Sequence, residues 1–129
     1  LELAHRQDDR RVAFLWIGGR GCSMLGLWEG GTSPNRTSLH IAFAIDLDAV
    51  LSAPTVLRAA GVEPLDFDRR STDEAWVFGW MPAAAVFFRD PDGHLLEYLA
   101  MLPDEPRPEA GVVPYSEWIS RWAPWSVRR

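Results

Sequence analysis

The sequence is poor in cysteine and has no long apolar stretch. Cys22 is the only cysteine among 129 residues, so no disulfide can form within the chain, and nothing in the composition calls for an oxidising compartment. No run approaches the roughly 18 consecutive apolar residues of a membrane-spanning helix, and no signal-peptide pattern is visible. These absences predict a cytoplasmic protein with no membrane partner.

Dense positive charge is missing as well. The net charge is −5 with histidine neutral, and no run of Lys or Arg interrupts the chain. Nucleic-acid-binding domains concentrate basic residues on one face or along one helix. The charge pattern therefore predicts no nucleic-acid partner.

Apolar and aromatic residues are plentiful. Hydrophobic residues make up 47% of the chain and charged residues 24%, a globular composition in a length that suits one domain with a buried core. Seven residues are tryptophan, which is a high count. Two interpretations stay open: these rings pack a core or an interface, or they line an apolar ligand pocket.

Three short strands are predicted in the first part of the chain. They cover residues 1–7, 11–17 and 22–29. Polar or glycine-rich turns separate them, and this close spacing predicts an antiparallel meander. We expect Leu1, Leu3 and His5 to share one face of the first strand. Because the first four residues already read as the middle of a strand, we also expect a further segment upstream of Leu1.

The second part of the chain predicts the order strand, helix, strand, strand, strand (βαβββ). These elements are expected over residues 38–45, 46–60, 62–67, 85–89 and 94–101, after a linking loop at 32–37. Period-two alternation places His40 on the face of its strand opposite to Leu39 and Ile41. Asp46 or Asp48 can cap the helix, and Gly61 is expected to end it.

The last two of these strands form a hairpin that contains an unusual carboxylate. Asp90-Pro91-Asp92-Gly93 has the composition of a tight turn, with proline presetting φ and glycine free to adopt a left-handed conformation. In the strand after the turn, Glu97 is surrounded by Leu95, Leu96, Tyr98 and Leu99. A carboxylate in such a strand is costly to bury unless it is paired, hydrogen-bonded or bound to a metal.

The composition changes after residue 102. Residues 103–108 are rich in proline and acidic side chains and are predicted to form an extended linker. A short helix is predicted over residues 115–122, with Ser116 as its N-cap. Trp118, Ile119 and Trp122 share one face of it, and this face is expected to be buried on this chain or on a partner.

The order of elements suggests an internal duplication. Residues 1–29 would repeat the last three strands of the βαβββ unit at 38–101 if a strand and a helix preceded Leu1. The segments HIAFAID, AAGVEPLDF and GWMPAAAVFFRDPDGHLLEYL, together with the βαβββ order, resemble the vicinal oxygen chelate superfamily. This superfamily includes glyoxalase I, extradiol dioxygenases, fosfomycin-resistance enzymes and bleomycin-resistance proteins.

The resemblance implies an α+β fold in which paired βαβββ modules form a cleft-shaped mixed sheet. The domain would cover residues 1–102, with 1–31 as an N-terminally incomplete first module and 38–102 as the second. Residues 103–129 would follow as the linker and the short helix. Proteins of this superfamily and size commonly pair, so a homodimer is expected, and the tryptophan-rich face of the last helix would suit its interface.

The resemblance also implies a metal site. His40 and Glu97 match the ligand positions on the first and last strands of the second module, and a further histidine is expected upstream of Leu1. Such a ligand set suits Mn²⁺, Fe²⁺, Ni²⁺ or Zn²⁺. The alternatives are that His40 is a strand histidine hydrogen-bonded in a polar pocket, and that Glu97 lies at a solvent-facing position of the sheet or pairs with Arg89.

Several neighbouring residues are candidates for a role at this site or have a simpler one. Trp80 and Arg89 are candidates for substrate binding, although pairing of Arg89 with an aspartate of the turn is an equal alternative. His94 is expected to be structural, and His5 lies on a strand that does not match a ligand strand.

One position separates this chain from glyoxalase I. That enzyme carries a further glutamate ligand at the position of Gly26, and Glu29 is offset by an odd number of residues, so it points to the opposite face. A three-ligand site of the dioxygenase or fosfomycin type is therefore expected.

The implied function is that of a divalent-metal-dependent enzyme acting on a small substrate with vicinal oxygens. Its chemistry would be that of a lyase, an isomerase, a dioxygenase or a fosfomycin-type transferase or hydrolase, and no catalytic base is assigned. The alternative is a metal-independent protein of the bleomycin-resistance type that binds a small ligand or drug. A third possibility is a regulatory or interaction domain that uses the fold as a scaffold.

Overall fold

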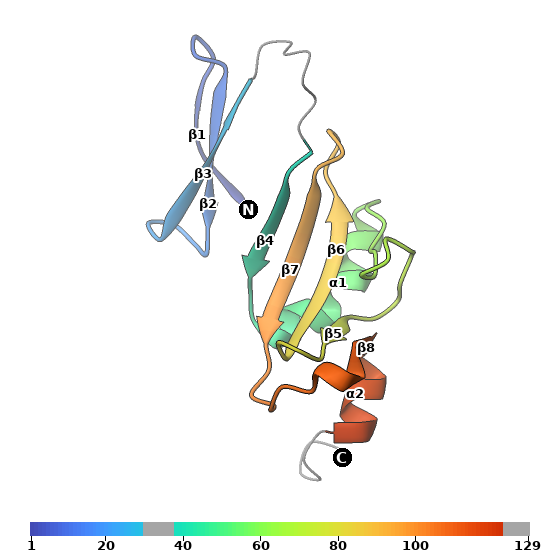
Figure 1. The fold of residues 1–129 in the computed structure, drawn as a ribbon. Helices are drawn as coiled ribbons and strands as arrows, with labels where there is room; N and C mark the ends of the chain where they lie inside the picture. The colour runs from blue at the N-terminus through green and yellow to red at the C-terminus, as the bar shows by residue number, and fades with distance from the viewer. Residues whose placement is uncertain (30–37, 123–129) are drawn as a thin grey trace. The chain divides into compact units, whose positions relative to one another are not determined.

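A computed structural model describes residues 1–29 and 38–122, and the chain divides into two units, Leu1–Thr37 and Ser38–Arg129 (Figure 1). Each unit is described here by itself. The loop predicted at 32–37 lies outside the described residues. No helix in the described part of the chain is long and apolar enough to cross a membrane.

The first unit is a three-stranded antiparallel sheet. Its strands are β1 (Glu2–Gln7), β2 (Val12–Ile17) and β3 (Ser23–Trp28), in the order β1-β2-β3. The meander predicted from the strand spacing is confirmed. The turn between β2 and β3 contains Gly18, Gly19 and Gly21. All three have positive φ, a conformation that glycine adopts at little cost.

A β-bulge in β1 changes which residues share a face. Leu3 pairs with Leu15 and His5 pairs with Phe14, so the register shifts between them and one residue of β1 has no separate partner. Leu15 and Phe14 are consecutive in β2 and therefore point to opposite faces. The prediction that Leu3 and His5 share a face is wrong, because the extra residue of the bulge interrupts the alternation.

The second unit is a five-stranded mixed sheet with two α-helices. Its elements are β4 (His40–Ala44), α1 (Leu47–Ala59), β5 (Trp76–Phe78), β6 (Ala83–Arg89), β7 (Leu95–Met101), the 3-10 helix η1 (Pro108–Ala110), β8 (Val112–Pro114) and α2 (Tyr115–Trp122). The strand order is β4-β7-β6-β5-β8, in which β4 runs parallel to β7 and the other pairs are antiparallel. The succession β4-α1-β5-β6-β7 confirms the predicted βαβββ order and the α+β fold class.

The strand predicted over residues 62–67 is wrong. The second strand of the unit is β5, and from the predicted segment only Leu65 pairs with the sheet, through an isolated bridge to Phe87. Pro64 has no backbone N–H to contribute, and aspartates follow Leu65, so this segment is poorly suited to a continuous strand. Residues 66–75 instead leave the sheet as a loop before the chain returns at Trp76.

Helix α1 ends as predicted but begins without a side-chain cap. Asp46 occupies the N-cap position with no hydrogen bond from its side chain. At the other end, the Gly61 N–H donates to the Arg58 carbonyl and the Val62 N–H donates to the Leu57 carbonyl, with a Gly61 φ of +76°. This is a Schellman ending, in which glycine adopts the left-handed conformation that other residues disfavour.

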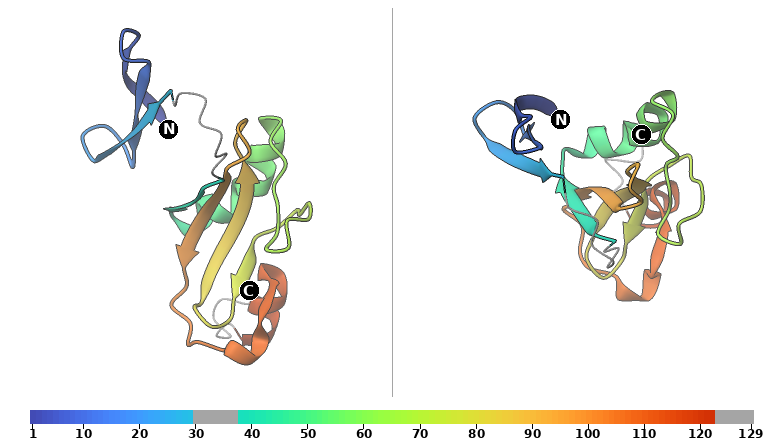
Figure 2. Two further views of the ribbon diagram at one scale, coloured as in Figure 1. Left: turned by 45° about the horizontal axis from the view of Figure 1, so that its top comes forward. Right: turned by 90° about the horizontal axis from the view of Figure 1, so that it is seen from above.

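Helix α1 lies against one face of the sheet (Figure 2), and the main core lies between the two. Its buried members are Val50, Ala53, Leu57, Ala75, Val77, Ala84, Val86, Phe88, Ala100, Leu102 and Trp118. Trp118 of α2 is fully buried in this core, and Ile119 and Trp122 pack against it. Trp118 is thus buried by its own chain and Ile119 and Trp122 are partly buried there, so the chain itself covers much of the face that was expected to be buried.

Residues 103–122 belong to the second unit. Strand β8 pairs with β5 at the edge of the sheet, and α2 follows it directly (Figure 1). Ser116 is not the N-cap of α2: its N–H and its hydroxyl donate to the two carboxylate oxygens of Glu74, at 2.9 and 3.1 Å. A carboxylate at a helix N-terminus is favourable because it accepts from unpaired amides and faces the positive end of the dipole.

Gly79→Ala is expected to destabilise this arrangement. The Gly79 N–H donates to the Gly111 carbonyl at 2.7 Å and the Arg107 N–H donates to the Gly79 carbonyl at 2.6 Å. A Cβ at position 79 would collide with the Arg107 carbonyl oxygen and lie 3.0 Å from that of Gly111. Urea denaturation followed by circular dichroism should show a loss of about 1–3 kcal/mol in the free energy of unfolding, as overpacking typically costs. A change below about 0.5 kcal/mol would contradict the close approach.

Candidate metal and ligand site

His40 and Glu97 meet on the face of the sheet that is turned away from α1. In the register of the sheet, Glu97 lies between Ala42 of β4 and Phe87 of β6, and His40 lies two residues before Ala42. Because Ala42 has only a methyl group, the imidazole of His40 can reach across to the carboxylate. His40 Nε2 lies 3.0 Å from Glu97 Oε2.

The two side chains differ in exposure. The Glu97 side chain is 7% exposed and the His40 side chain 49%. Glu97 Oε1 is buried and has no hydrogen-bond partner among the described residues. Burial raises the pKa of the Glu97 carboxyl, although the hydrogen bond and charge of His40 and the charge of Arg69 oppose the rise. The carboxylate is therefore held in a place that disfavours its charge unless a cation compensates it.

The pair has the composition and spacing of two metal ligands. Two donor atoms that bind one ion at about 2.1 Å are roughly 3.0 Å apart in an octahedral site and roughly 3.4 Å apart in a tetrahedral one. The separation of 3.0 Å seen here is that of a hydrogen bond and is close to what an ion would require. The unpartnered Glu97 Oε1 leaves a further lone pair for a cation. Within residues 1–29 and 38–122, no group of three or more His, Cys, Asp or Glu is arranged to hold a metal ion. The residues present fit a divalent ion that takes its remaining ligands from elsewhere.

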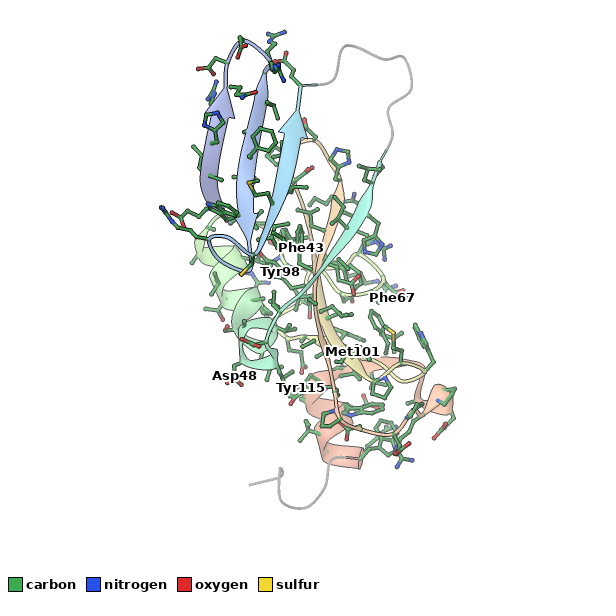
Figure 3. All side chains as sticks on the ribbon, turned by 90° about the vertical axis from the view of Figure 1, so that its left-hand side faces the viewer. Phe43, Asp48, Phe67, Tyr98, Met101 and Tyr115 are labelled. Atoms are coloured by element: carbon green, nitrogen blue, oxygen red, sulfur yellow. The ribbon has the colours of Figure 1, made fainter. Side chains whose placement is uncertain are left out.

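An aromatic cluster adjoins the pair. Phe67, Phe78, Trp80 and Phe87 form it, with ring centroids 5.2 to 6.3 Å apart, and the ring of His40 lies 5.8 Å from that of Phe87. Figure 3 shows Phe67 on the opposite side of the sheet from α1. Phe67 and Trp80 remain partly exposed, at 39% and 48%. They present apolar surface to any ligand that reaches Glu97.

A positive charge that acts on Glu97 comes from a residue that the sequence analysis did not single out. Arg69, in the loop between α1 and β5, holds its guanidinium carbon 5.4 Å from the centroid of the Phe87 ring and 5.9 Å from that of Phe67. Arg89 lies at the end of β6, where its side chain donates to the Gly93 carbonyl of the hairpin turn at 3.0 Å. No pattern in the sequence pointed to Arg69, because its loop has no periodicity and is brought to this face by the bridge between Leu65 and Phe87.

The comparisons with known proteins agree with this architecture. The family model of the glyoxalase/bleomycin resistance protein/dioxygenase superfamily matches residues 1–98. The chain belongs to this superfamily. The resemblance noted from the sequence is thereby confirmed.

Two solved structures share the superfamily fold with this chain. An integron cassette protein from the mobile metagenome of the Halifax Harbour sewage outfall aligns with a TM-score of 0.59 and 27% identity, over 78% of this chain and 77% of that one. A glyoxalase/bleomycin resistance protein/dioxygenase from Nocardioides aligns with a TM-score of 0.51 and 22% identity, over 81% of this chain and 70% of that one. No curated protein matches the chain.

The other histidines of this superfamily member make different contacts. His94 Nδ1 accepts a hydrogen bond from the Leu39 N–H at 3.0 Å and so ties the hairpin turn to the start of β4. The His94 N–H donates to Asp90 Oδ1 at 2.8 Å within the turn itself. In the first unit, the ring of His5 stacks on that of Phe14 at 6.5 Å.

The position that is expected to distinguish this chain from glyoxalase I lies in the first unit. Gly26 of β3 pairs with Phe14 of β2. Glu29 follows the end of β3 and forms an ion pair with Arg11 at 2.7 Å. Its carboxylate is therefore already neutralised by a neighbouring cation.

Each of the two units has a hollow on its surface. One of about 220 Å³ lies in the second unit, lined by Asp66, Phe67, Asp68, Trp76 and Val112. Phe67 belongs both to this hollow and to the aromatic cluster, so the two are neighbours. The other, of about 440 Å³, lies on the first unit and is lined by Arg6, Asp8, Arg11, Val12, Ala13, Leu27 and Glu29. Its charged side chains pair with each other, Arg6 with Asp8 and Arg11 with Glu29, which leaves it no evident reactive group.

Proposed function

We propose that this protein is a divalent-metal-dependent enzyme that acts on a small substrate with vicinal oxygens. His40 and Glu97 would supply two of the ligands of the ion, which would be Mn²⁺, Fe²⁺, Ni²⁺ or Zn²⁺. The observation that supports this most strongly is the buried carboxylate of Glu97, which has one oxygen beside His40 and the other without a described partner. A purely structural carboxylate in such a place would be expected to have both oxygens hydrogen-bonded.

The proposed chemistry is the stabilisation of negative charge on the substrate by the positive charge of the ion. A bound divalent ion would act as a Lewis acid and stabilise negative charge that develops on the substrate oxygens. Glu97 would supply the compensating negative charge, and its burial would strengthen that interaction because the local dielectric is low. The aromatic cluster would hold the apolar part of the substrate and keep water from it.

A metal-independent ligand-binding protein is the second candidate. It is favoured by the exposed surfaces of Phe67 and Trp80, which could hold an aromatic or apolar ligand without any ion. Under this alternative, the hydrogen bond between His40 and Glu97 would be the complete role of the pair.

Metal reconstitution separates the two candidates. The full chain is stripped with a chelator, and Mn²⁺, Fe²⁺, Ni²⁺ and Zn²⁺ are then titrated by calorimetry while thermal unfolding is followed. At least one ion is expected to bind with a stoichiometry near one per chain and to raise the melting temperature, since a ligand specific to the folded state stabilises it. Failure of all four ions to bind would contradict the proposed enzyme and favour the metal-independent binder.

A further inference from the structure

Arg69 is a cation on the site face without a carboxylate in contact. Most other arginine side chains in the described part of the chain pair with an aspartate or a glutamate, whereas no such pair involves Arg69. Its Nη1 donates to the Phe67 carbonyl, and its guanidinium lies over the faces of Phe67 and Phe87. A guanidinium has five N–H donors, so most of them remain for another acceptor.

The backbone holds Arg69 in an unusual conformation. Its φ is +67°, in the left-handed region that residues with a Cβ disfavour. The buried Asp66 fixes it there: the Asp66 carbonyl accepts from the Arg69 N–H at 3.1 Å, and Asp66 Oδ1 accepts from the Arg70 N–H at 2.9 Å. Strained conformations of this kind persist where the surroundings enforce them, and they concentrate at functional sites. The cation is thus positioned before any ligand arrives.

We propose that Arg69 binds an oxyanion of the substrate, such as a carboxylate, while the apolar or aromatic body of the same molecule lies against Phe67 and Trp80. A guanidinium stacked on rings keeps its planar edge free for bidentate hydrogen bonds to an oxyanion. The inference deepens the proposed function, because it names the class of molecule that the site beside Glu97 accepts. The substrate is therefore anionic in addition to carrying vicinal oxygens.

A simpler role for Arg69 is to balance the charge of Glu97. In that case the cation would act on the carboxylate alone, and the charge of a ligand would not matter to its binding. The two roles are distinguished by comparing the binding of two ligands that have the same shape but differ in charge.

Benzoate and benzamide form such a pair, because they share their shape and differ in charge. Their binding to the full chain is measured by ligand-observed NMR in the presence of EDTA, so that neither can bind through a metal. The wild type is expected to bind benzoate about tenfold more tightly than benzamide, as a charge-assisted pair would give. Arg69→Asn should remove this preference, because benzoate loses its charged partner. Asparagine is chosen because it tolerates a positive φ.

Arg70→Asn is the matched control. Arg70 is exposed, lies in the same loop and carries the same charge, and its side chain is 3.9 Å from Asp68. This variant should keep the wild-type preference. If Arg69→Asn does not fold, Arg69→Gly provides the same test, since glycine relieves the positive φ.

Equal binding of the two ligands by the wild type, no binding of either, or a preference that survives in the Arg69 variant would each overturn the proposal. Because the measurement needs neither metal nor turnover, it can succeed or fail independently of the metal reconstitution. The proposed enzyme and the proposed anion site are thereby tested separately.

Discussion

Glu97→Gln is expected to weaken divalent-metal binding by more than about 100-fold and to reduce any turnover to background. Glutamine has nearly the same shape, so the packing around position 97 is preserved. It lacks the negative charge that makes a carboxylate oxygen a stronger ligand for a divalent ion than a neutral amide oxygen. Removing a group beside a ligand already costs roughly 10–100-fold in affinity, and removing a ligand itself should cost more. Calorimetric titration of the ion that binds the wild type measures the loss.

The same substitution should not destabilise the metal-free protein. Burial raises the pKa of the Glu97 carboxyl. A group whose pKa is higher in the folded state favours folding below its unfolded-state pKa, and that contribution is lost as the pH rises through the folded-state pKa. At neutral pH the charged carboxylate is therefore unfavourable, and a neutral glutamine should keep or raise the melting temperature.

An exposed glutamate provides the control for this experiment. Glu105→Gln makes the same chemical change in the segment after β7, and the side chain there is exposed. It should leave both metal affinity and stability unchanged. Wild-type metal affinity in Glu97→Gln would rule out Glu97 as a ligand, and a loss of affinity in both variants would point to a general charge effect instead.

Trp118→Ala is expected to lower the free energy of unfolding by about 3–5 kcal/mol, the usual cost of removing a large aromatic side chain from a core. Trp118 is fully buried, and its ring centroid lies 4.9 Å from that of Trp122. It joins α2 to the core that α1 and the sheet share. Since domains of this size are stable by only about 5–15 kcal/mol, the variant should lose a large fraction of its stability. Urea denaturation followed by circular dichroism measures the change.

Two further variants test whether the cost of Trp118→Ala comes from the loss of a buried aromatic ring. The indole nitrogen of Trp118 is buried without a hydrogen-bond partner among the residues described. Trp118→Phe therefore loses no hydrogen bond, and it should cost clearly less than the alanine variant. Val56→Ala, at a position of α1 that is 62% exposed, should change the free energy of unfolding by less than about 0.5 kcal/mol. A Trp118→Ala cost in that same small range would contradict the central place of α2 in the core.

Local patterns in the sequence were sufficient for much of the fold. The turn at 90–93 was predicted because its residues match the conformation required: Gly93 has a φ of +86° and its N–H donates to the Asp90 carbonyl at 3.0 Å. The alternation in β4 predicted that His40 would face away from Ile41, and the register bears this out. Each of these features depends on residues within one strand or one turn, where steric preference and period-two alternation decide the outcome.

The errors occurred where distant residues decide the local structure. Residues 62–67 are apolar enough for a strand, but only Leu65 joins the sheet, since Pro64 and the following aspartates cannot extend the ladder. Ser116 was a plausible cap by its type, yet Glu74, 42 residues away in the chain, fills that role. A contact between segments so far apart leaves no periodicity in either of them.

At the candidate site, too, some features follow from local sequence and others from contacts between distant segments. The sequence by itself determined that His40 and Glu97 lie on alternating positions of their strands, and the resemblance to the superfamily paired them as ligands. Only the tertiary structure placed their side chains 3.0 Å apart, because that distance depends on the parallel pairing of β4 with β7 and on the small side chain of Ala42 between them. It also brought Phe67 and Arg69 to the same face, since a loop takes its place from the surfaces against which it packs and not from its own residue pattern.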